Sequence, residues 1–136
     1  MLNNLKVVMV LIVGAMMLNA CDSAPGSDEL YQEVMKYHDE AMPHMGALYK
    51  AVKKTEEKIN NLDSLATDDV SKELESQLET FKSARASMQQ WMRDFGSTYN
   101  KDLPEAEQVK ILQDELIKVK EMSKEMMKAV ELSKKI

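Results

Sequence analysis

The chain has one cysteine, three prolines and four glycines among its 136 residues, and it contains almost no strand signal. A single cysteine excludes a disulfide framework within one chain. The glycines are too scattered for a glycine-rich loop that cradles a phosphate. No internal repeat of the kind that builds a solenoid is present. These absences favour one small helical domain without nucleotide-binding motifs.

Basic clusters are also absent, and the formal net charge is −5. Nucleic-acid binding needs clustered lysine and arginine, so the acidic balance argues against a nucleic-acid partner. Lysines do recur in the last third, but they alternate with acidic residues at offsets of three and four. This pattern predicts a solvated helix face with ion pairs, formed by Lys110, Lys118, Lys120, Lys124, Lys128, Lys134 and Lys135 with Asp114, Glu115, Glu121, Glu125 and Glu131.

The N-terminal segment 1–20 is typical of an export signal. Lys6 precedes an apolar run over residues 7–13, and small residues follow before Cys21. Residues 18–21 (Leu-Asn-Ala-Cys) resemble the bacterial lipobox. The resemblance implies that the signal is cut before Cys21 and that this residue, including its amine, is acylated. Several acyl chains anchor a protein firmly to its membrane.

A lone cysteine could instead be a free thiol or half of an intermolecular disulfide. The position of Cys21 at the end of the lipobox favours acylation over both alternatives. We therefore expect three parts: a cleaved signal peptide over 1–20, an acylated cysteine and tether over 21–27, and a folded domain over 28–136.

Three amphipathic stretches predict an all-α fold. Apolar residues recur every three or four positions over about 28–62, 67–95 and 102–136, and the second stretch follows a heptad. Connections of roughly five to eight residues favour antiparallel neighbours. The sequence thus predicts an antiparallel three-helix bundle with long, coiled-coil-like helices.

Several residues predict where these helices begin, bend and end. Ser27 is a plausible N-cap of the first helix, and Pro43 predicts a kink near Met42 and Pro43. Gly96 is expected to stop the second helix. Asp102 offers a cap for the third helix, with a glutamate three residues on.

Methionine is abundant, with eight of the 12 methionines after Cys21. Folding the first two helices about a pivot near residue 65 places His38 level with Met92, and Met42 level with Met88. Trp91 and Met45 lie beside this group, whereas His44 points about a third of a turn away. Thioethers and imidazole select Cu(I) over hard cations, so a copper site formed by His38, Met42, Met88 and Met92 is one interpretation.

The alternative is that these methionines are ordinary core residues, because methionine fills irregular gaps and packs on aromatic rings. No catalytic constellation is apparent. His38 and Asp39 are adjacent in a helix and are expected to point apart, and the Glu-x-x-His motif of di-iron bundles is missing. We therefore expect a protein that is not an enzyme.

Two segments, residues 37–46 (YHDEAMPHMG) and 88–95 (MQQWMRDF), resemble small methionine-rich lipoproteins of Bacteroidota, some labelled "viral A-type inclusion protein". The resemblance covers most of the chain after Cys21 and implies an envelope lipoprotein without catalytic residues. That family has a basic residue at the position of His44, which implies that His44 is dispensable.

Two functions remain open from the sequence. The first is a non-enzymatic, lipid-anchored module of the bacterial cell envelope, periplasmic or associated with the outer membrane, that binds or spaces another envelope protein. The second is a Cu(I)-binding lipoprotein that uses the His38 and methionine cluster.

Overall fold

Four α-helices and one 3₁₀ turn make up the computed structural model, which describes residues 24–62 and 67–136. The chain runs through α2 (Ser27–Ala41), the 3₁₀ turn η2 (Met42–His44), α3 (Met45–Asn60), α4 (Asp68–Thr98) and α5 (Glu105–Ser133). No strand occurs in these two ranges. The predicted all-α, antiparallel three-helix bundle is confirmed, with α2 and α3 forming one interrupted helix. The signal segment 1–20 and Cys21 lie outside the described residues.

The interruption lies at Pro43, where the kink was predicted. Proline has no amide hydrogen and its ring clashes with the preceding turn, so an α-helix cannot pass through it undisturbed. The chain instead makes the 3₁₀ turn Met42–His44, and the α-helix resumes at Met45. As a result, α2 and α3 face different neighbours.

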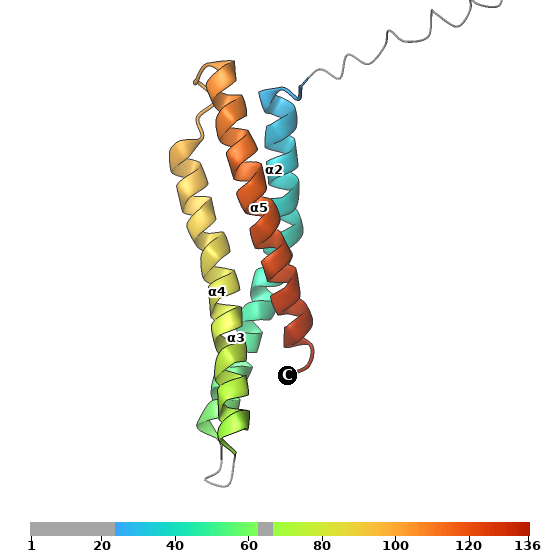
Figure 1. Ribbon diagram of the computed structural model, residues 1–136, viewed down its shortest axis with the longest axis vertical. Coiled ribbons are helices and arrows are strands. Elements are labelled where there is room, and N and C mark those ends of the chain that lie inside the picture. Colours follow the sequence, from blue (N-terminus) through green and yellow to red (C-terminus); the bar gives the residue numbers. More distant parts are fainter. Residues whose placement is uncertain (1–23, 63–66) are drawn as a thin grey trace, which may run out of the picture.

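Each half of the first helix has its own principal partner. α2 packs mainly on α5, whereas α3 packs mainly on α4, and α4 also packs on α5. Figure 1 shows the resulting rod, with the α4–α5 connection at one end and the close of α3 and start of α4 at the other. Two surface ion pairs join the same pairs of helices. Lys120 of α5 pairs with Glu33 of α2 at 2.8 Å, and Lys82 of α4 pairs with Glu56 of α3 at 2.9 Å.

The apolar stripes meet along the rod in a single core. Its fully buried large side chains include Phe81, Leu48, Met88, Leu112 and Met126. The first third of the stripe on α4 differs from the heptad prediction, because Val70 is 45% exposed. α5 ends before it reaches that end of the rod (Figure 1), so among the described helices α3 is the one that packs along this part of α4.

The predicted end of α4 and the predicted start of α5 are both wrong. Gly96 does not stop α4, which continues to Thr98. A glycine stop needs a positive φ, and no described glycine has one. The added turn brings Tyr99 over Phe95, with ring centroids 5.4 Å apart. Asp102 is not the cap of α5 either, since the helix begins at Glu105 after Pro104 and has no side-chain cap.

Ser27 also has a role other than the predicted cap. It is the first residue of α2, after Gly26, and it is buried. Its amide and its hydroxyl donate to the two carboxylate oxygens of Glu105, each at 2.8 Å. The start of α2 is thereby joined to the start of α5.

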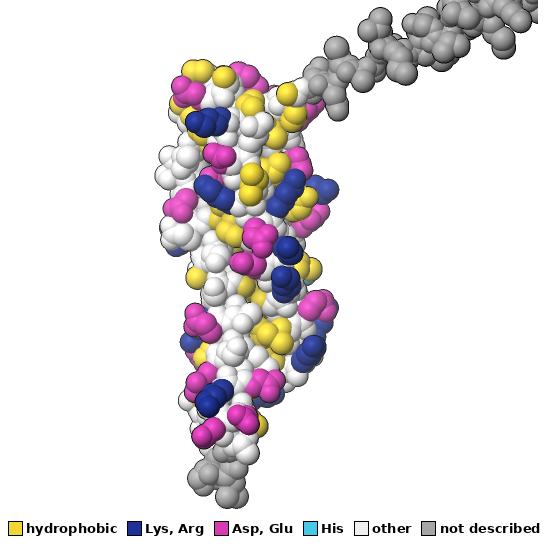
Figure 2. Space-filling view, viewed as in Figure 1, with side chains coloured by type: hydrophobic (Ala, Val, Ile, Leu, Met, Phe, Trp, Pro, Cys, Tyr) yellow, Lys and Arg dark blue, Asp and Glu magenta, His cyan; other side chains and the backbone are white. Residues whose placement is uncertain are grey.

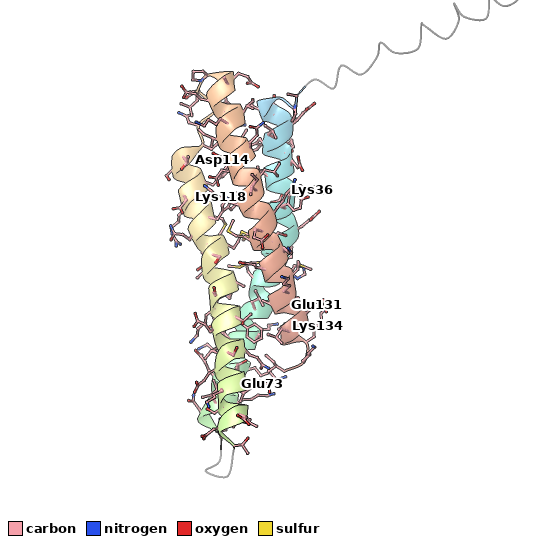
Figure 3. The ribbon with its side chains drawn as sticks, viewed as in Figure 1. Lys36, Glu73, Asp114, Lys118, Glu131 and Lys134 are labelled. Carbon is pink, nitrogen blue, oxygen red and sulfur yellow. The ribbon has the colours of Figure 1, made fainter. Side chains whose placement is uncertain are left out.

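Elsewhere the surface is polar and mixed in charge. Figure 2 shows acidic and basic side chains interspersed along the face in view, with small apolar areas between them. Glu131 and Lys134, labelled in Figure 3, form one of the ion pairs within α5. Exposed pairs of this kind contribute about 0–1 kcal/mol each. The bundle therefore depends on its core rather than on its surface charges.

The link between Ser27 and Glu105 predicts a pH dependence of stability. The Ser27 amide, and then its hydroxyl, hold the pKa of Glu105 below its ordinary value of 4.5. Because the folded-state pKa is the lower one, ionised Glu105 stabilises the fold above pH 4.5, and this stabilisation is lost as the pH falls through the folded-state pKa. Urea unfolding should show the native chain more stable than Glu105→Gln at pH 7, with the difference shrinking towards pH 3.

Glu107→Gln is the matched control, because Glu107 is an exposed acid in the same first turn of α5. Its difference from the native chain should vary less with pH. A difference between native and Glu105→Gln proteins that stays constant from pH 7 to pH 3 would contradict the assignment.

Candidate functional site

Long side chains bridge the space between α2 and α4. Trp91 and Phe95 lie one turn apart on α4, and Tyr99 follows directly after the helix ends. The three rings stack in sequence, with centroids 5.0 and 5.4 Å apart. From α2, the ring of Tyr31 stacks on Tyr99 at 5.3 Å. We call this contact region the α2–α4 seam, and it consists of Tyr31, His38, Trp91, Met92, Phe95 and Tyr99.

His38 belongs to the part of the seam next to Trp91, and it has three close neighbours. Its Nε2 atom is 3.4 Å from Sδ of Met92, and its Nδ1 atom is 2.9 Å from Oδ1 of Asp39. Its ring centroid is 5.8 Å from that of Trp91. The side chain is 18% exposed, so the imidazole sits near the surface but is mostly covered.

The contact between His38 and Asp39 corrects a prediction. Adjacent helix residues point in different directions, and the two side chains were expected to diverge. They meet because Nδ1 is the ring nitrogen nearer the backbone and the carboxyl of Asp39 bends towards it, at 2.9 Å. Asp39 itself is 70% exposed, so it is a surface group that also holds the imidazole.

The structure brings two of the four predicted metal ligands, His38 and Met92, into contact. Met42 and Met88 lie one helical turn further along their segments. Met88 is fully buried, and Met42 and Met45 are half-buried against the core. His44 belongs to the 3₁₀ turn rather than to the seam. A role of this cluster in metal binding stays a prediction.

Trp91 also makes a polar contact on the side away from His38. Its indole Nε1 donates to Oε2 of Glu115 at 2.8 Å, and Glu115 is only 4% exposed. Lys118 donates to the other carboxylate oxygen at 2.7 Å. This hydrogen bond is the main reason that the pKa of Lys118 is raised above its ordinary 10.5. The carboxylate is thus fully paired inside the α4–α5 interface.

The burial of Glu115 was not predicted, because its place in an alternating charge pattern indicated a solvated face. The available signal was Trp91, since a buried indole N–H needs an acceptor. A shallow groove of about 620 Å³ opens beside the pair, between α4 and α5. Lys118 and Asp114, labelled in Figure 3, lie on α5 in this part of the rod, and Lys118 lines the groove with Arg93 and Met122.

A second hollow, of about 700 Å³, lies at the end of the rod where α3 ends and α4 begins. Both of these helices extend past α5 there. Its apolar lining includes Leu62, Val70, Leu74 and Ile136. Lys54, Lys58 and Glu73 supply charges around it. This is the part of the stripe that α5 leaves uncovered.

The described part of the chain lacks one common kind of metal site. No group of three or more His, Cys, Asp or Glu side chains gathers there in a form that could hold a metal ion. In the same ranges, no helix is both long enough and apolar enough to cross a membrane.

Comparison with known proteins gives no relative. No protein-family model matches the sequence, and no curated protein or solved structure shows significant similarity to it.

The buried contact between Trp91 and Glu115 predicts a measurable coupling. Trp91→Phe leaves one carboxylate oxygen of Glu115 without its donor, and it should lower the free energy of unfolding by about 1–3 kcal/mol. In a Glu115→Ala background the same change should cost less, with a coupling of about 0.5–3 kcal/mol. Urea unfolding followed by far-UV circular dichroism measures all four proteins. Strictly additive costs would contradict a stabilising bond.

Proposed function

We propose that the chain is a lipid-anchored lipoprotein of the bacterial cell envelope, with the helical bundle as a non-enzymatic binding or structural module. The observation that carries this proposal is the placement of Cys21. It ends a lipobox-like sequence, and only five residues separate it from α2, which begins at Ser27. The resemblance to methionine-rich envelope lipoproteins supports the same function.

The short linker limits how the bundle can sit at a membrane. Five residues span at most about 18 Å even when fully extended. The end of the rod that contains the start of α2 and the α4–α5 connection is therefore held near the lipid. α4 has 31 residues and a length of about 46 Å, so the opposite end can extend well into the surrounding space.

The distal end has the features of a binding surface. Val70 is 45% exposed there, and it lines the hollow with Leu62 and Leu74. An apolar centre with a polar, charged rim is a feature that this hollow shares with interfaces between proteins. A partner in the envelope would thus meet the bundle at the end away from the anchor.

Acylation of Cys21 is the direct test of this function. Expression in a bacterium supplied with labelled palmitate should place the label on the native chain, which should fractionate with membranes. Cys21→Ser should remain unlabelled, because it lacks the thiol that receives the lipid, and should keep the uncleaved segment 1–20. Mass spectrometry of the N-terminal peptide identifies both products.

Ser23→Ala is the matched control, since it changes a neighbouring residue and leaves the cysteine and the lipobox-like sequence in place. It should be labelled like the native chain. A native chain that is released without lipid, or that is cleaved at a site other than the bond before Cys21, would overturn the proposal.

A further inference from the structure

At His38, two atoms with free electron pairs lie close together, namely Nε2 of His38 and Sδ of Met92. Nδ1 of His38 is 2.9 Å from the Asp39 carboxylate, which can only accept a hydrogen bond when ionised. The proton of a neutral imidazole therefore belongs on Nδ1. Nε2 is then unprotonated, and it faces the Met92 thioether, which has no proton to donate. A neutral His38 in this tautomer makes no hydrogen bond to the sulfur.

This arrangement matches the surroundings of histidines that bind metals. Such a histidine almost always donates its second ring N–H to a carboxylate, carbonyl or water, and this bond fixes the tautomer and orients the ring. Asp39 occupies that position here. The free nitrogen points towards Met92 and the inside of the seam rather than to solvent.

The separation of the two donor atoms also fits a shared ion. Zinc lies about 2.0 Å from an imidazole nitrogen and about 2.3 Å from a cysteine sulfur, and we take similar lengths for an ion held by an imidazole and a thioether. Two such ligands on one tetrahedral centre are therefore about 3.5 Å apart. The observed distance between Nε2 and Sδ is 3.4 Å, so the pair can hold an ion without separating α2 from α4.

We propose that the α2–α4 seam binds one soft monovalent metal ion, Cu(I), between Nε2 of His38 and Sδ of Met92. In this proposal Met42 and Met88, which lie one helical turn from His38 and Met92 along their segments, supply the thioethers that complete the ligand set. Asp39 is a positioning residue that keeps Nε2 free. The ion lies beside the indole of Trp91, whose ring is 5.8 Å from that of His38.

The chemistry of the neighbours selects a soft ion. Thioethers bind Cu(I) well and bind magnesium or calcium poorly, because those hard ions take oxygen ligands. The face of an indole adds attraction for a cation. Met42 lies in the 3₁₀ turn, and such interruptions of a helix are frequent at hinges, which allows its side chain to adjust to the ion.

The test is an anaerobic titration of the full chain in detergent with Cu(I), in competition with a chromogenic Cu(I) chelator. Every protein in the series carries Cys21→Ser, which removes the one thiol and makes the result independent of the proposed lipid anchor. We expect one Cu(I) per chain and quenching of the emission of Trp91, the chain's single tryptophan. Equimolar Zn(II) should leave the bound Cu(I) in place.

Met92→Leu is the decisive variant, because it removes the sulfur while conserving the side-chain volume. It and His38→Ala should each weaken binding at least about tenfold, since even the outer partners of metal ligands contribute 10- to 100-fold. His38→Ala combined with Met42→Leu should abolish tight binding. His44→Ala and Met127→Leu are the matched controls and should bind as the parent does.

Far-UV circular dichroism establishes that each variant is folded before it is titrated. A folded Met92→Leu protein that binds Cu(I) as tightly as the parent would overturn the proposal. So would equal losses in the two control variants, displacement of Cu(I) by Zn(II), or absence of tight binding by the parent. In each of those cases the seam is not a Cu(I) site of the proposed kind.

Discussion

The break in the helix at Pro43 determines which helices of the bundle pack against each other. An uninterrupted helix from Ser27 to Asn60 would lie along one groove of the bundle, but the 3₁₀ turn gives α2 and α3 different partners. α3 packs on α4, whereas α2 packs on α5 and meets α4 only through long side chains. The α2–α4 seam is the consequence, and it contains the exposed edge of His38.

Trp91 contacts both His38 on one side of the seam and Glu115 on α5. One side of the indole neighbours the ring of His38, and its N–H is bonded to the buried Glu115. Because Lys118 neutralises that carboxylate, the tryptophan is fixed between α4 and α5 without an unpaired charge. The indole ring lies next to a mostly covered imidazole and a thioether. A soft cation can be held in such a setting.

Much of this arrangement could be predicted from the spacing of residues. Apolar periodicity predicted three antiparallel helices, and the pivot near residue 65 predicted that His38 lies opposite Met92, as observed. What failed depends on contacts between distant segments. The burial of Glu115 is determined by an indole on another helix, and Glu105 pairs with Ser27 rather than with its own helix end. Local charge patterns contain no information on such partners.

The proposed site requires that His38 presents an unprotonated Nε2 to the sulfur of Met92. Nitrogen-15 NMR of the histidine rings in the metal-free chain, recorded in alkaline buffer, tests it directly. The structure predicts that the His38 proton resides on Nδ1, with the Nε2 shift of a bare ring nitrogen. A proton on Nε2, donated towards Met92, would contradict the account.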